Sequence, residues 1–123
     1  MSVPPTLPFY LHALIELPAS LNFFFRPSEQ LPTPAPQAHA IIRQYAVLLF
    51  TSNVIALVFA LRPIDDTSKL VAAALALYHM APLVRATLRI GRGDAYGQGL
   101  GGPWGHFGVH GVCLGGLVRL WLS

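Results

Sequence analysis

The chain has 123 residues, of which 54% are hydrophobic and only 11% are charged, and its formal net charge is +3. Soluble domains carry about 25% charged residues, so this composition argues against a soluble globular domain. The eight basic residues stand mostly at the ends of apolar runs. This placement indicates membrane topology and excludes a nucleic-acid-binding surface.

Four apolar runs occupy most of the chain. A helix that crosses a bilayer needs about 17–25 predominantly apolar residues. Short connections between successive spans favour antiparallel neighbours. We therefore predict an all-α fold, an integral membrane up-down-up-down four-helix bundle that forms one transmembrane domain over residues 1–123. The predicted spans are residues 7–25, 45–61, 69–85 and 104–122.

The first run contains two ionisable residues, His12 and Glu16, which are four positions apart and therefore share one helix face. Ionisable residues inside a membrane normally face the bundle interior and pair there. One interpretation is an acid–base pair that acts on a lipophilic substrate. The other is an interhelical clamp whose partner is a polar residue such as Asn53. Pro18 predicts a bend beside the pair.

The second run is preceded by a proline-rich segment, residues 26–44, which favours extended backbone. Asn53 lies near the middle of this run and is interpreted as a hydrogen-bonding residue between helices. Its neighbour Ser52 can bond to its own helix and needs no partner. After the run, Ser68 or Thr67 is predicted to cap the third helix.

The third run contains His79 three residues before Pro82, so an imidazole and a predicted helix kink coincide. A structural role is the simpler interpretation of His79. Beyond it, Arg85, Arg89 and Arg92 have helical spacing and predict contact with anionic lipid headgroups if the helix continues. If the helix ends at the following glycines, they are solvated loop arginines.

The fourth run contains His106 and His110, whose spacing resembles half of a helical zinc site. Further ligands would have to come from His12, Glu16 or His79. Two histidines alone are a weak signal, so the sequence predicts no metal and no cofactor.

Small residues also recur along the fourth run. Gly111 and Gly115 form a small-xxx-small pair that allows close approach of another helix. That helix would belong to the same chain or to a partner, so a homo- or hetero-oligomer through this pair is one possible assembly.

The distribution of Lys and Arg predicts the orientation. Five arginines lie beside the first and third loops, whereas Arg62, Lys69 and Arg119 lie on the other side. The side with more basic residues is expected to be cytoplasmic, which places both termini outside the cytoplasm. An internal membrane such as the endoplasmic reticulum is favoured over the plasma membrane.

Three segments carry a resemblance to a known group of proteins. The stretches HALIELPA from His12, RQYAVLL from Arg43 and YHMAPLVR from Tyr78 resemble small four-span membrane proteins of filamentous fungi. The resemblance implies a four-span membrane fold and brings no activity with it.

The sequence thus predicts a polar cleft inside a membrane protein that binds or transforms a lipophilic small molecule, with membrane lipids as partners. The alternative is a non-catalytic subunit or assembly factor that docks a partner through its glycine-rich fourth helix. No phosphate-binding loop and no G-x-S-x-G nucleophile motif is present, so no reaction is assigned. The ligand-binding candidates are His12, Glu16, Asn53, His79 and His110.

Overall fold

The computed structural model describes residues 4–94, 96 and 98–123, and the regular elements within them are all helical. No strand is present in these ranges, which confirms the predicted all-α class. Short 3-10 helices lie in the connections, at Pro27–Gln30, Pro36–Ala38 and Gly99–Gly101. The four α-helices are α1 (Leu7–Phe25), α2 (His39–Ala60), α3 (Asp66–Arg92) and α4 (Gly102–Leu122).

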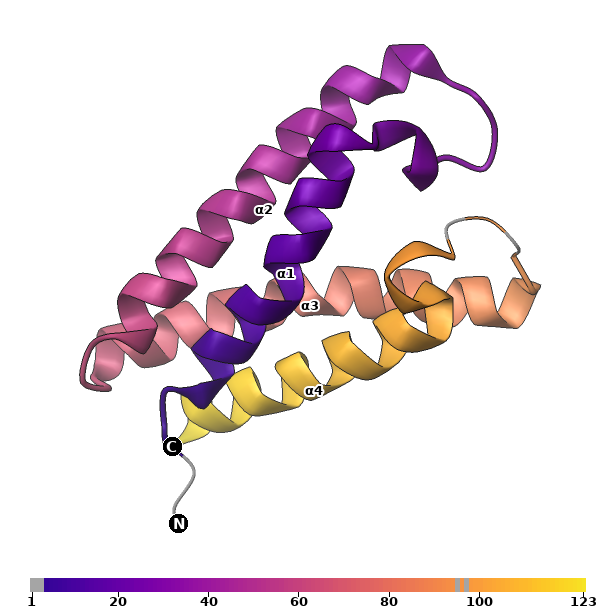
Figure 1. Cartoon of the computed structure of the whole chain (residues 1–123). Helices are drawn as coiled ribbons and strands as arrows, with labels where there is room; N and C mark the ends of the chain where they lie inside the picture. Colours follow the sequence, from indigo (N-terminus) through magenta and orange to yellow (C-terminus); the bar gives the residue numbers. More distant parts are fainter. Residues whose placement is uncertain (1–3, 95, 97) are drawn as a thin grey trace.

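The helices form two antiparallel pairs that diverge from a common end (Figure 1). Helix α1 packs along α2, α3 packs along α4, and α1 also contacts α4 where the pairs meet. The start of α1 and the C-terminus lie at this closed end, together with the turn between α2 and α3. The arrangement therefore differs from a bundle of four nearly parallel helices, because the two pairs separate towards the opposite end.

The closed end contains a core to which all four helices contribute. Phe9 is completely buried there and stacks at a tilt on Phe59, with ring centroids 6.0 Å apart. Most of the other buried members are alanines, whose small side chains let helix backbones approach closely. The core consists of Phe9, Ala56, Ala60, Ala72, Leu75, Ala76, Leu117 and Leu120.

The helix boundaries agree with the predicted spans at some ends and extend beyond them at others. Helix α1 begins and ends where predicted, and Pro18 lies inside it. Helix α2 begins at His39, because the proline-rich connection forms 3-10 turns that lead into the helix instead of staying fully extended. Helix α3 continues through Gly91 to Arg92 and ends at Gly93, whose φ of 65° lies in the left-handed region that glycine adopts freely.

The N-terminus of α3 is capped by Asp65, so the prediction of Ser68 or Thr67 as cap was wrong. One carboxylate oxygen of Asp65 accepts a hydrogen bond from the Ser68 backbone N–H at 2.7 Å. The Ser68 hydroxyl in turn accepts from the Asp65 N–H at 3.4 Å, which completes a capping box. The hydrogen bond from the Ser68 backbone is the main reason that the pKa of Asp65 lies below its usual value.

The three arginines at the end of α3 are all helical, but they do not form one exposed stripe. Arg85 and Arg92 are exposed, whereas Arg89 is only 6% exposed. The Arg89 guanidinium lies 4.5 Å from the centroid of the Tyr96 ring and donates a hydrogen bond to the Tyr96 carbonyl. Only the two exposed arginines are therefore available to external anions.

The glycines of α4 have different surroundings. A side chain added at Gly116 would contact Pro8 at 3.6 Å, so α1 approaches α4 closely at this position. At Gly111 and Gly115 an added Cβ would meet no described atom within 4 Å. The predicted small-residue pair is therefore not used for packing within the described part of the chain.

By length and composition, two of the described helices could cross a membrane. They are Pro36–Ala60, which joins the preceding 3-10 turn to α2, and Asp66–Arg92, which is α3. Helices α1 and α4 do not meet the same criteria; α1 includes His12 and Glu16, and α4 is rich in glycine. This finding alone is weak support for four spans, because core helices of soluble proteins also pass the same test.

The capping box generates a stability prediction. Asp65→Ala should lower the melting temperature of the purified protein, because the first turn of α3 loses the acceptor for the Ser68 N–H. The pKa of Asp65 is depressed in the folded state, so its contribution is complete above the unfolded pKa and is lost as the pH falls through the folded pKa. Circular-dichroism melts at several pH values test both effects.

Asp66→Ala is the matched control, because Asp66 is adjacent and acidic but does not supply the cap. Equal melting temperatures for Asp65→Ala and Asp66→Ala at neutral pH would contradict the assignment of the cap.

Candidate functional site

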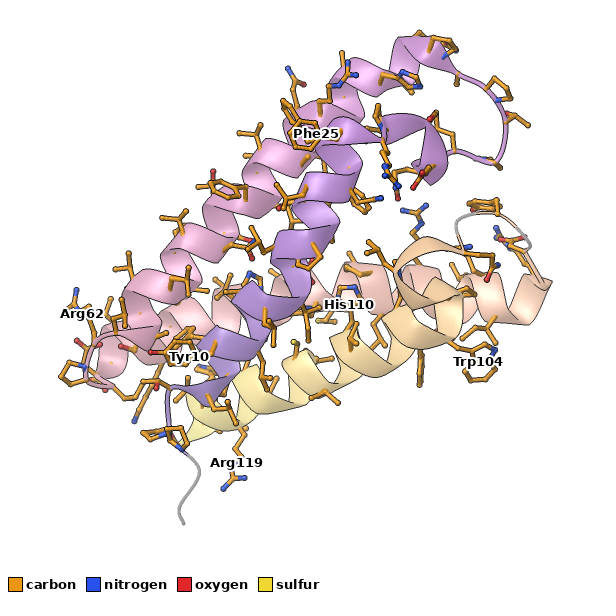
Figure 2. The ribbon with its side chains drawn as sticks, viewed as in Figure 1. Tyr10, Phe25, Arg62, Trp104, His110 and Arg119 are labelled. Atoms are coloured by element: carbon orange, nitrogen blue, oxygen red, sulfur yellow. The ribbon has the colours of Figure 1, made fainter. Side chains whose placement is uncertain are left out.

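A cluster of ionisable side chains is buried where the two helical pairs begin to diverge. His12 and His79 are 0% exposed and Glu16 is 1% exposed, while His110 is 6% exposed. Helix α1 supplies the first histidine and the glutamate, α3 supplies His79 and α4 supplies His110. Figure 2 shows His110 among the side chains between α1 and α4, whereas Trp104 and Arg119 lie on the outside near the two ends of α4.

The cluster contains a chain of hydrogen bonds that runs from α2 to α4. Ser52 donates to the carbonyl of Leu49 at 2.7 Å, and its hydroxyl oxygen lies 3.0 Å from Nε2 of His12. Nδ1 of His12 is 2.9 Å from Nε2 of His79. Nδ1 of His79 is in turn 2.8 Å from Nδ1 of His110. Both ring nitrogens of His79 are thus engaged, and its imidazole links α1 to α4.

The carboxylate of Glu16 has two different environments at its two oxygens. Oε2 accepts a hydrogen bond from the hydroxyl of Tyr78 at 3.1 Å, and the Tyr78 hydroxyl accepts one from Tyr45 at 3.3 Å. Oε1 is buried and makes no hydrogen bond to any residue that the structure describes. It faces two imidazole nitrogens instead, Nδ1 of His110 at 3.2 Å and Nδ1 of His79 at 3.6 Å.

Three atoms suited to a metal ion therefore converge at one point. They are Oε1 of Glu16 and the Nδ1 atoms of His79 and His110, and the residues that carry them are all buried. Imidazole nitrogen and carboxylate oxygen are the ligands that transition metals such as zinc take in proteins.

A cleft leads from this cluster towards the open end of the molecule. Its volume is about 210 Å³, and both Glu16 and His110 line it. Tyr78 and Ala19 form part of its wall, and Arg85 lies nearer the exposed rim. The polar cluster is thus accessible from one side, while the alanine-rich core closes the other side.

The local sequence explains how each helix contributes to the cluster. His12 and Glu16 are one turn apart on α1, so both project from the face that meets the other helices. Tyr78 and His79 are consecutive on α3 and diverge around the helix, so the tyrosine reaches Glu16 Oε2 while the histidine reaches His12 and His110. Pro82 follows one turn after Tyr78 inside the same helix.

The structure brings together four of the five predicted ligand-binding candidates, namely His12, Glu16, His79 and His110. The expected direct bond between His12 and Glu16 is wrong, because His79 lies between them and bonds to His12 instead. Asn53 is buried, but among the described residues neither its Oδ1 nor its Nδ2 has a hydrogen-bond partner, and it does not line the cleft.

His106 and Ser52 lie at the edges of the cluster. His106 lies one turn from His110 and contacts it edge to face with ring centroids 6.0 Å apart, but it is not part of the converging set. Ser52 bonds to its own helix as predicted, and it also contacts His12.

Tyr78 and Tyr45 were missed as functional candidates. The signal for Tyr78 was its place beside His79 and one turn before Pro82, and nothing in the sequence marked Tyr45 beyond its position at the edge of an apolar run.

Comparison with known protein families, with characterised proteins and with solved structures finds no match for this chain. The site is therefore interpreted from its own geometry.

The hydrogen bonds to Glu16 generate a second prediction. Tyr78→Phe removes the only described hydrogen-bond donor to Oε2 and leaves a buried carboxylate oxygen unpaired. We expect the free energy of unfolding to fall by about 1–2 kcal/mol, the upper part of the range for interhelical hydrogen bonds. Denaturant titration in detergent, followed by circular dichroism, measures the change.

Tyr45→Phe is the matched control, because it removes a hydroxyl from the half-exposed end of the same chain of hydrogen bonds. It should cost clearly less than Tyr78→Phe, and equal losses for the two variants would show that the carboxylate does not depend on Tyr78.

Proposed function

We propose that the chain is an integral membrane protein of four spans whose polar cleft binds or transforms a lipophilic small molecule. The observation that carries this proposal is the buried carboxylate–imidazole cluster at the inner end of a cleft. Ionisable groups are costly inside a membrane and normally mark a functional site there.

The distribution of side chains supports the membrane location. Large apolar residues are exposed along every helix, for example Leu14 at 72%, Leu48 at 68% and Leu77 at 69%. The buried positions are occupied largely by alanine and leucine, together with polar residues such as histidine and serine. Soluble monomers rarely expose apolar surface on this scale, whereas lipid requires it.

The size of the cleft supports a particular class of ligand. A volume of about 210 Å³ is below the range of about 300–1,000 Å³ that encloses a drug-sized molecule. The cleft therefore fits the polar end of an amphiphile better than a whole lipophilic molecule. Glu16 and His110 would contact that polar end.

A second, shallower groove of about 540 Å³ runs along the outside of α3 and fits the apolar remainder. Leu77, Met80 and Val84 line this groove, and it shares Ala81 and Arg85 with the cleft. An amphiphile with its head at the cluster would pass Ala81 and lay its tail against these apolar side chains. Arg85 and Arg92, both exposed, would contact anionic lipid headgroups nearby.

A second candidate function is that of a non-catalytic subunit. The observation in its favour is the open space beside Gly111 and Gly115, which no described helix of the chain fills. Such glycines allow close contact with a transmembrane helix of another chain. This role is compatible with a ligand in the cleft, because the two sites use different parts of α4.

Membrane insertion and orientation generate the third prediction. The protein should stay with membranes after alkaline carbonate extraction, since its exposed surface is apolar along all four helices. Glycosylation tags at both termini should be modified, because the arginine-rich side is expected to be cytoplasmic. Release of the protein by carbonate would contradict four spans, and unmodified tags with a modified first loop would reverse the orientation.

The cleft itself generates the fourth prediction. Ala81→Trp places a large side chain where the cleft and the groove meet. It should reduce labelling by a photoreactive, clickable fatty acid about tenfold, which corresponds to about 1.4 kcal/mol of binding free energy. Labelling of the purified protein in detergent is measured by in-gel fluorescence, and the labelled peptide is mapped by mass spectrometry.

Ala74→Trp is the matched control, because Ala74 is an exposed alanine on the same helix that lines neither the cleft nor the groove. Equal labelling of the wild type and both variants would overturn the proposed binding site.

A further inference from the structure

We propose that Glu16, His79 and His110 bind a divalent transition-metal ion, with His12 as a supporting residue that orients His79. The proposed ligand atoms are Oε1 of the glutamate and Nδ1 of each histidine. The site is argued from the arrangement of these atoms and does not depend on the lipophilic ligand proposed above.

The spacing of the three atoms matches a metal coordination sphere. Their mutual distances are 2.8, 3.2 and 3.6 Å. Ligand atoms bound at about 2.0–2.1 Å in a tetrahedral zinc site are about 3.3 Å apart. The observed distances bracket this value, so an ion could occupy the common point with only small shifts of the side chains.

The hydrogen bonds around the cluster decide where the imidazole protons lie when the rings are neutral. Ser52 donates its proton to the Leu49 carbonyl, so it must accept from Nε2–H of His12. Nδ1 of His12 then carries a lone pair and accepts from Nε2–H of His79. Consequently Nδ1 of His79 carries a lone pair, which is directed at the converging point.

The same reasoning leaves one carboxylate oxygen, Oε1 of Glu16, without a donor in the metal-free cluster. Nδ1 of His110 can give its one proton to Nδ1 of His79, at 2.8 Å. Oε1 of Glu16 makes no hydrogen bond to any described residue and is shielded from solvent. A buried, unpaired carboxylate oxygen is costly. With the His110 proton moved to Nε2, a dication at the common point would interact with all three atoms at once and remove this cost.

The surroundings also match those of known metal sites. Metal-bound histidines usually donate their second ring N–H to an acceptor that fixes the ring, and bound carboxylates are usually hydrogen-bonded as well. His79 has such an acceptor in His12, and the second oxygen of Glu16 has such a donor in Tyr78. Both supporting contacts lie on the side of the ring or carboxylate away from the proposed ion.

Three protein ligands leave room for a further one, as in catalytic sites with two histidines and one glutamate. Glu16 and His110 line the cleft, so a molecule in the cleft could reach the ion. An ion there would polarise a carbonyl or hydroxyl oxygen of that molecule. This last step rests on the proposed function, whereas the metal site itself does not.

The test uses the full chain, purified in detergent with an affinity tag that contains no histidine. Elemental analysis by mass spectrometry measures the metal that co-purifies and identifies it as zinc, iron or another ion. The protein is then stripped with a chelator and titrated with Co²⁺, whose visible absorption bands report the coordination geometry. We expect saturation at about one ion per chain and displacement of Co²⁺ by Zn²⁺.

Four variants separate the proposed ligands from their neighbours. His110→Ala and Glu16→Gln should abolish the Co²⁺ spectrum, and Glu16→Gln keeps the size and shape of the side chain. His12→Ala should weaken binding about 10–100-fold, as expected for a supporting residue. His106→Ala is the matched control, because it removes a partly buried histidine one turn away that is not among the converging atoms. It should bind like the wild type.

The outcomes are distinguishable from those of the lipid-labelling experiment. The metal proposal is overturned if folded wild-type protein, verified by circular dichroism and gel filtration, shows no saturable Co²⁺ binding. It is equally overturned if His110→Ala and Glu16→Gln bind as tightly as His106→Ala. Labelling of the cleft by the photoreactive fatty acid in chelator-treated protein would leave the proposed function standing even in that case.

Discussion

The burial of one carboxylate constrains this molecule more than any other single feature. Glu16 is almost completely shielded, and a charge in such a place must be compensated by donors or by a cation. The three other helices all contribute side chains to its surroundings. Tyr78 donates to one oxygen, Tyr45 on α2 supports that tyrosine, and His79 and His110 face the other oxygen. The packing of α1 against the rest of the molecule is therefore organised around its least apolar residue.

The divergence of the two helical pairs opens one side of this buried cluster to a cleft. At the closed end alanines allow α2 and α3 to come near α1 and α4, and Phe9 fills the space between them. Further along, the pairs separate (Figure 1). Larger and polar side chains line a cleft there. The cluster lies at the transition between these regions. The alanine-rich core shields the cluster on one side, and the cleft gives a ligand access to it on the other.

Sequence reasoning could find the helices and most of the polar cluster. A histidine or glutamate within an apolar run is conspicuous, so His12, Glu16, His79 and His110 were predicted from the cost of placing them there. Asn53 satisfied the same criterion, but it lies on a part of α2 where no described polar side chain reaches it. The burial of a side chain can be predicted from the polar and apolar pattern of its own helix. Its hydrogen-bond partners depend on how that helix is placed against the others.

That placement explains the remaining differences. A bundle of parallel helices would have allowed His12 and Glu16 to pair on α1 alone. The side chain of His79 on α3 reaches α1 and lies between them, and His110, the predicted candidate on α4, bonds to it. The contact between Tyr78 and Glu16 likewise depends on how α3 is placed against α1. The sequence did not reveal it, because aromatic residues at the edge of an apolar run normally indicate only an interface anchor. The cap of α3 was misplaced by a few residues, as helix ends usually are.

The adjacency of Tyr78 and His79 on α3 also fixes how the two helical pairs fit together. Successive residues of a helix differ in direction by about 100°, so a shift of one residue along α3 would turn both side chains away from their partners. Tyr78 bonds to α1 and α2, while His79 bonds to α1 and α4. Apolar contacts with alanine tolerate sliding and rotation, but these directional bonds do not. The polar cluster therefore sets the register of an interface between helices that small side chains alone would leave free to slip.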